Sequence, residues 1–166
     1  MERDFFICPI QINRKVVYTI NYQNDFSGFH LTPDGSIAAF TSISKLDEYA
    51  AQMKITHLRC LETYNLDIAF DWLKSPKGKS IECSKFIDVW NLSGDYRNAV
   101  AQKNMDSEDK SHAELYQKLF WGCNLPAVTP AGKKFRPVWT KAEVRELKRV
   151  MRESLSIFEQ HLSVQA

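Results

Sequence analysis

The run from Thr140 to Leu162 constrains the fold most, because it has the pattern of one long amphipathic helix. Thr140 and Glu143 have the spacing of a capping box, in which each side chain bonds the backbone of the other residue. Trp139 and Val144 are spaced as a hydrophobic staple around that cap. Apolar residues then recur within roughly 80° of one another on the helical wheel, at Val144, Leu147, Met151, Leu155, Phe158 and Leu162. A helix with a single apolar face must lie on a core that the rest of the chain supplies.

The N-terminal part of the chain has the pattern of a β-sheet. Strands are predicted over residues 5–10 and 16–22, and two further extended segments flank the turn Pro33-Asp34-Gly35. Another strand is predicted within residues 56–64. Between them, Ser44 is placed to cap a helix and Asp47 to complete its capping box. We therefore expect a small antiparallel sheet with one helix packed beside it.

The remainder of the chain is predicted to be helical, with one irregular interruption. Apolar residues recur at helical spacing before Pro76, over residues 84–101 and over residues 107–121. Residues 122–138 hold two glycines and three prolines, which prevent regular structure there. The embedded Leu125, Val128, Phe135 and Val138 favour an ordered loop that lies against the body of the protein.

These patterns predict a single α+β domain over residues 1–166, with a strand-rich part at 1–64 and a helical part at 65–166. A chain of 166 residues is long enough to bury a core without disulfides or metals. No apolar run approaches the roughly 18 residues that cross a bilayer, and the first residues lack a secretion signal. We therefore expect no membrane partner and a cytoplasmic location.

No sequence motif indicates catalysis, a metal site or a cofactor. The four cysteines are far apart and have no C-x-x-C pair, so we expect reduced thiols in or near the core. Asp67 and Asp71 are one helical turn apart and could share a proton or hold a metal, although carboxylates at this spacing are usually surface charge. We predict a protein that is not an enzyme, with no catalytic residues, no cofactor and no small-molecule substrate.

The positive charge is concentrated near the C-terminus. Residues 131–152 carry eight Lys and Arg but only two Glu, in a chain with a net charge of +2. The wheel places Lys141, Arg145, Lys148 and Arg152 in one stripe beside the apolar face. Together with the preceding loop they form what we call the basic face: Lys133, Lys134, Arg136, Lys141, Arg145, Lys148 and Arg152. Acidic residues of the same chain could neutralise it, or it could bind nucleic acid or phosphate groups, although no nucleic-acid recognition motif is present.

Two stretches are similar to known families. The segment DGSIAAFTSISKLDEYAAQM, residues 34–53, resembles the turn, strand and capped helix of SseB-like domains. The segments FIDVWNLSGDYRNAV and PVWTKAEVRELKRVM are similar to the helical halves of immunity proteins that bacteria encode beside toxins of contact-dependent growth inhibition and other polymorphic toxin systems. The resemblance implies an α+β protein that binds a cognate toxin C-terminal domain, as a 1:1 complex, and blocks its active site. Such proteins act by occlusion, so the resemblance implies no catalytic residues.

The chain offers two candidate partner surfaces. Many antibacterial toxins are nucleases with basic clefts, so an inhibitor can meet them with carboxylates. The carboxylates expected to do so are Asp88, Asp95, Asp106, Glu108 and Asp109. The basic face would instead suit an acidic toxin surface. The sequence leaves open which of the two surfaces binds, and it disfavours nucleic acid as the partner.

Overall fold

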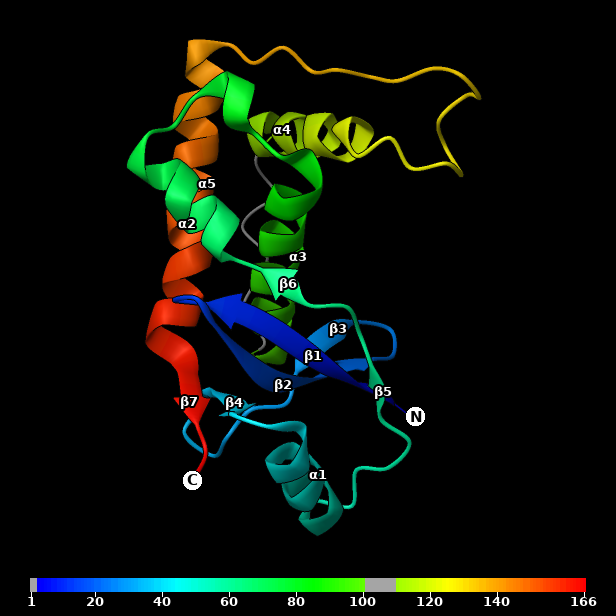
Figure 1. The fold of residues 1–166 in the computed structure, drawn as a ribbon, viewed down its shortest axis with the longest axis vertical. Helices are drawn as coiled ribbons and strands as arrows, with labels where there is room; N and C mark the ends of the chain where they lie inside the picture. Colours follow the sequence, from blue (N-terminus) through cyan, green and yellow to red (C-terminus); the bar gives the residue numbers. More distant parts are fainter. Residues whose placement is uncertain (1–2, 101–109) are drawn as a thin grey trace.

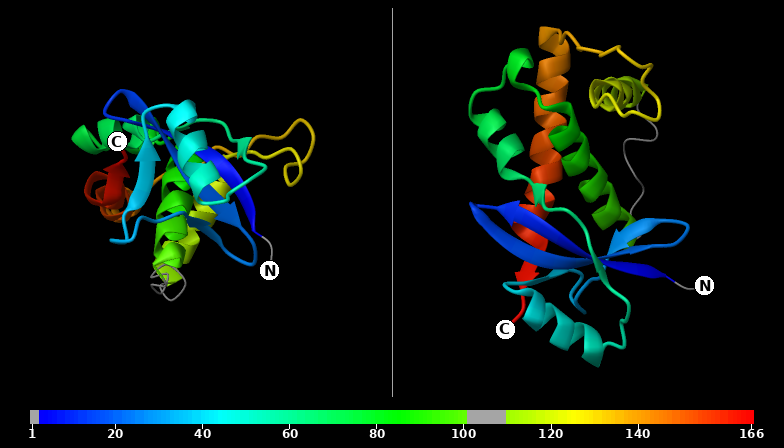
Figure 2. Two further views of the ribbon diagram at one scale, coloured as in Figure 1. Left: turned by 90° about the horizontal axis from the view of Figure 1, so that it is seen from below. Right: turned by 45° about the vertical axis from the view of Figure 1, so that its right-hand side comes forward.

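A mixed β-sheet crosses the molecule, and helices cover both of its faces (Figures 1 and 2). The computed structural model describes residues 3–100 and 110–166. Within these residues the sheet has seven strands: β1 (Asp4–Ile12), β2 (Lys15–Gln23), β3 (Ser27–Phe29), β4 (Ile37–Phe40), β5 (Arg59–Cys60), β6 (Tyr64–Asn65) and β7 (Leu162–Val164). The predicted α+β class is confirmed.

The four strands of the first forty residues pair with one another in antiparallel fashion, and the later strands join them in the parallel direction. β1 pairs with β2, and β2 pairs with β3 and β4, all in antiparallel fashion. The short strands β5 and β6 pair parallel to β1, and β7 pairs parallel to β4. The antiparallel sheet expected in the N-terminal part is therefore present in β1 to β4, and it is extended by parallel strands that the sequence did not indicate, because strands that return after helices and long connections can enter in the parallel direction.

Among the described residues, α2, α3, α4 and α5 lie on one side of the sheet and α1 lies on the other (Figure 1). The bounds on the first face are α2 (Asp67–Lys74), α3 (Cys83–Ala99), α4 (Lys110–Gly122) and α5 (Lys141–His161), with a short 3-10 turn, η1, at Gly78–Ser80. Helix α1 (Ile43–Gln52) covers the opposite face. Helix α3 contacts α2, α4 and α5 as well as β3 and β6, so it is the central element of the larger layer.

Side chains on opposite faces of the sheet belong to two separate hydrophobic cores, one under the larger helical layer and one under α1. In β1, Cys8 and Ile10 face the larger helical layer, while Ile7 faces α1. In β4, Ile37 joins the larger core and Phe40 joins the smaller one. The two-residue period of a strand explains this division.

Helix α5 forms as the sequence predicts. The hydroxyl oxygen of Thr140 accepts a hydrogen bond from the Glu143 amide at 3.1 Å, and the Glu143 carboxylate accepts one from the Thr140 amide at 2.9 Å. Its buried residues include Leu147, Met151 and Phe158, three of the predicted stripe. The helix ends at His161, however, and Leu162 begins strand β7, which the prediction of a helical C-terminal half did not include.

Two local expectations, on the cap of α1 and on Cys60, need correction. The cap of α1 is Ser42, whose hydroxyl accepts from the Lys45 amide at 3.2 Å, and the predicted cap, Ser44, lies inside the helix. The helix expected over residues 84–101 is present as α3, which runs from Cys83 to Ala99 and continues unbroken through Gly94. Cys60 is exposed in β5, whereas Cys8 and Cys83 are buried as expected.

None of the described helices combines the length and the apolar character that crossing a membrane requires.

Candidate functional site

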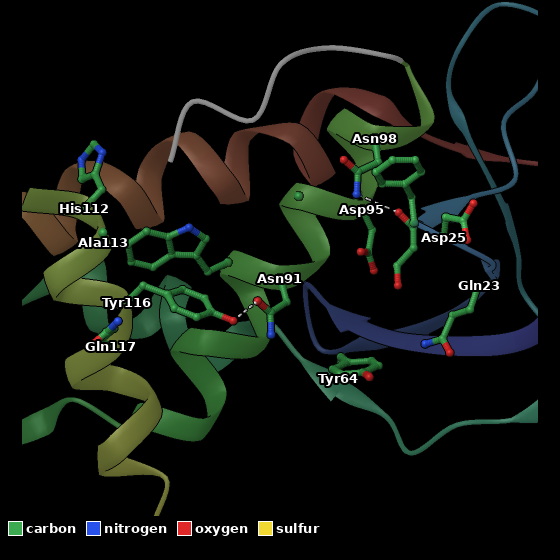
Figure 3. Close-up of a pocket in the computed structure, with 14 residues that line it drawn as sticks. Gln23, Asp25, Tyr64, Asn91, Asp95, Asn98, His112, Ala113, Tyr116 and Gln117 are labelled. Carbon is green, nitrogen blue, oxygen red and sulfur yellow. Dashed lines mark hydrogen bonds between the residues drawn. The ribbon is translucent and has the colours of Figure 1, made fainter. Parts of the chain in front are cut away.

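An open groove of about 730 Å³ lies between the β2–β3 turn, β6, α3 and α4, and we call it the polar groove. Polar and aromatic side chains line it, including Asp25, Tyr64, Asn91, Asp95, Asn98 and Tyr116. Figure 3 shows Asp25, Asp95 and Asn98 at one end, and His112 and Tyr116 of α4 at the other. The groove is therefore a concave polar surface built from four separate parts of the chain.

The spacing along α3 explains why its polar side chains meet in the groove. Asn91, Asp95 and Asn98 are separated by four and three residues, which places them on one face of a helix. The Asn98 side-chain amide donates to the Ser27 carbonyl at 3.0 Å and thereby ties the β2–β3 hairpin to α3. The Tyr116 hydroxyl donates to the Asn91 amide oxygen at 2.7 Å and ties α4 to α3 (Figure 3). These bonds hold the walls of the groove in place.

Of the predicted acidic surface, Asp88 and Asp95 are described, and Asp95 lines the groove. Its carboxylate accepts a hydrogen bond from the side-chain amide of buried Asn21 at 3.2 Å. Burial raises the pKa of Asp95 to about 6, against the smaller opposing effect of the Asn21 hydrogen bond. Within the described residues no cation forms an ion pair with Asp95. Asp95 is thus a partly desolvated carboxylate in contact with an open space.

The other members of the predicted acidic surface are less well placed or are not described. Asp88 lies two helical turns before Asp95 on the same side of α3 and is half-buried. Burial raises the pKa of Asp88, and the charge of Lys85 opposes the rise. Asp106, Glu108 and Asp109 lie outside the described residues. Asp25 of the β2–β3 turn lines the groove near Asp95 and is not among the site residues predicted from the sequence.

Asp67 and Asp71, the alternative catalytic pair, belong to a structural clamp on the β1–β2 turn. Asp67 is buried and accepts hydrogen bonds from the backbone amides of Asn13 and Arg14, both at 2.9 Å. It also accepts from the Gln11 side chain at 3.1 Å. The Nη2 nitrogen of Arg14 donates to both carboxylate oxygens of Asp71, at 2.9 and 2.8 Å. This ion pair lowers the pKa of Asp71. Both carboxylates already have structural partners, and neither lines the polar groove.

The basic face has no ion-pair partner in the part of the chain that the structure describes. Within residues 3–100 and 110–166, none of Lys133, Lys134, Arg136, Lys141, Arg145, Lys148 and Arg152 forms an ion pair. The acidic side chains of α5 bond other residues: Glu143 pairs with Lys118 of α4 at 3.0 Å, and Glu146 and Glu153 pair with Arg149. Asp88 and Asp95, which the sequence offered as possible internal partners of the basic face, form no direct ion pair with it within the described residues.

The segment between α4 and α5, residues 123–139, extends away from the helices and is called the arm (Figure 1). It carries Lys133, Lys134 and Arg136 of the basic face together with several exposed apolar side chains. The prediction that its apolar residues lie on the body was wrong for Leu125, Val128, Phe135 and Val138, all of which are exposed. The prolines of the arm prevent it from forming a helix or a central strand.

The described residues hold no group of three or more His, Cys, Asp and Glu side chains that could bind a metal ion. The spacing of Asn91, Asp95 and Asn98 along one face of α3 is the sequence signal that could have revealed the groove. Asp25 and Tyr64, by contrast, come from segments that only the fold brings near that face.

No protein-family model matches the chain, and no curated protein matches it in sequence. Among solved structures, the fold is similar to that of the SatS C-terminal domain, crystallised in complex with bromine. The TM-score is 0.54 at 15% sequence identity, and the match covers 97% of this chain and 94% of the SatS chain. At this identity the likeness shows a shared fold and leaves the function of this chain open.

Proposed function

We propose that this chain is an immunity protein that binds a cognate bacterial toxin domain and neutralises it by covering its active site. The proposed toxin is a nuclease, the proposed complex is 1:1, and the proposed location is the cytoplasm. The protein acts by binding and does not itself catalyse a reaction.

The observation that carries the proposal is Asp95 in the polar groove. A carboxylate that has lost part of its hydration gains most from a cationic partner that enters the same space and restores its electrostatic stabilisation. The groove is open and has room for a Lys or Arg side chain beside Asp25 and Asp95. A toxin nuclease carries such cations around its substrate phosphates, so a groove with carboxylates matches the surface that an inhibitor must cover.

The rest of the groove suits a protein partner. Tyr64 and Tyr116 offer large amphipathic surfaces, and tyrosine is enriched at the centres of protein interfaces. Asn91 and Asn98 keep hydrogen-bonding groups at the same surface, and their existing bonds hold them in a fixed position. A preformed surface of this kind binds with a smaller loss of conformational entropy.

The test is co-purification with the product of the neighbouring upstream gene, together with protection of cells that express this product. The proposal expects a 1:1 complex and survival of the cells. Asp95→Asn should weaken the complex by at least about 30-fold, the effect of removing one member of a buried charge pair worth about 2 kcal/mol. Asp47→Asn, an exposed change on α1 at the opposite face of the sheet, is the matched control and should leave binding unchanged.

Two results would count against the proposal in different ways. Absence of both binding and protection would remove the immunity function. Binding that is equally strong with Asp95→Asn and with the unchanged chain would remove the polar groove as the contact surface.

A further inference from the structure

The arm and the adjoining end of α4 expose apolar side chains that a monomer ordinarily buries. Trp121, at the end of α4, is 46% exposed, and Phe135 is 45% exposed. Leu125, Val128 and Val138 are also exposed. Single exposed apolar residues are common, but five within one short region are typical of a binding surface.

Some of these side chains form a recess. Trp121, Val128, Pro130 and Phe135 line a depression of about 270 Å³, and Lys133 and Lys134 stand at the same depression. This volume is smaller than a typical small-molecule pocket but suits one large apolar side chain. The recess therefore fits an anchor residue of a peptide better than a complete ligand.

The arm holds its shape through bonds of its own. The Asn124 side chain bonds Phe135 twice, accepting from its amide at 2.6 Å and donating to its carbonyl at 2.9 Å. Gly132 has φ of 76°, a conformation that glycine adopts without strain, and next to it the Lys133 amide donates to the Pro130 carbonyl at 3.1 Å. The recess is thus preformed, which lowers the entropy lost on binding.

The positive charge around the recess favours a partner that carries carboxylates. Lys133, Lys134 and Arg136 have no ion pair within the described part of the chain, and all three are exposed. We propose that the arm docks a short acidic peptide segment of a partner protein, which places one bulky apolar side chain in the recess and its carboxylates against these cations. This proposal does not depend on the proposed immunity function.

The lining favours a peptide over nucleic acid or a lipid surface. Single-stranded nucleic acid binds where successive bases stack on aromatic side chains along a charged groove, whereas the recess holds two aromatic side chains, Trp121 and Phe135, at one depression of about 270 Å³ that has no room for a row of bases. A membrane surface would be met by a flat amphipathic face, whereas Trp121, Val128 and Phe135 line a depression. A peptide with one apolar side chain between carboxylates can fill the recess and pair with the cations at the same time.

The test is a selection of 12-residue peptides from a random display library against the full chain, followed by binding measurements with the enriched peptides. We expect sequences with one Leu, Phe or Trp among several Asp and Glu. The double variant Lys133→Glu with Lys134→Glu should lower their affinity at least 10-fold, as should Phe135→Ala. The control double variant Lys15→Glu with Lys45→Glu changes the net charge equally at exposed sites in β2 and α1 and should retain binding.

Failure to enrich acidic peptides, or equal binding by the double variant at the arm and by the control, would overturn the proposal. Stronger binding of a 20-nucleotide single strand or of vesicles with anionic lipids, lost in the same arm variants, would assign the surface to those partners and also overturn it. Asp95→Asn should leave peptide binding intact, so this result is independent of the toxin experiment.

Discussion

The carboxylate of Asp95 on α3 and the side-chain amide of Asn21 on β2 are joined by a hydrogen bond of 3.2 Å at the side of the polar groove. Asn21 is buried, and one neutral donor compensates only part of the hydration that Asp95 loses. The raised pKa of Asp95 means that its charged form costs stability in the isolated protein. Such a cost is expected where a residue serves binding instead of folding.

The first prediction concerns the pH dependence of stability. Because the pKa of Asp95 is raised to about 6 in the folded state, the folded protein binds a proton here more readily than the unfolded chain does. The stabilising contribution of this proton is complete below about pH 4 and is lost as the pH rises through about 6. Asp95→Asn should therefore be more stable than the unchanged protein at pH 7.5, by about 1–2 kcal/mol, and this advantage should shrink at pH 5.

Urea unfolding followed by tryptophan fluorescence at both pH values measures this difference. Titration of other groups affects both proteins alike and cancels in the comparison. An advantage of the variant that is the same at pH 7.5 and pH 5 would contradict the assignment.

A second prediction separates the two carboxylates of the β1–β2 clamp. Asp67→Ala leaves the amides of Asn13 and Arg14 without their acceptor and should lower the free energy of unfolding by about 2–3 kcal/mol, as expected for hydrogen bonds to a buried charged group. Asp71→Ala removes only an exposed ion pair with Arg14 and should change stability little. Equal losses in chemical unfolding would show that the clamp depends on both carboxylates.

A third prediction tests the cap of α5. Thr140→Ala removes the acceptor for the Glu143 amide and should lower the free energy of unfolding by about 1 kcal/mol. Thr140→Ser retains the hydroxyl and should be close to neutral. Thermal unfolding followed by circular dichroism compares the two, and a Ser variant as unstable as the Ala variant would point to the lost methyl group instead of the cap.

A fourth prediction concerns strand β7. A chain that stops after His161 loses the pairing of Leu162 with Ile37 and of Val164 with Ala39, as well as the bond from the Gln165 amide to the Ala39 carbonyl. It should lose about 3 kcal/mol of stability, because β4 becomes an unpaired edge and Ile37 loses apolar cover. Removal of Ala166 alone is the control. A truncated chain as stable as this control would show that β7 contributes little.

The patterns that gave correct predictions are local. The capping box of Thr140 and Glu143 and the apolar spacing behind it define α5, because both depend on residues within a few turns of one another. The strands β1 and β2 follow from β-branched and aromatic residues that can be read along the chain. The cap of α1 was placed two residues late because Ser42 and Ser44 are equally suitable by residue type, and only the extended backbone of Ser42 distinguishes them.

The sequence by itself determined the α+β class, the helix that ends the helical layer and the position of the irregular arm, because hydrophobic periodicity, capping residues and prolines act over short distances. Only the tertiary structure decided that β7 pairs with β4, that Asp67 holds a turn more than fifty residues away, and that Asp95 meets Asp25 and Tyr64 in a groove. These relationships depend on how separate elements pack in three dimensions, and no local pattern of residues encodes the contacts between them.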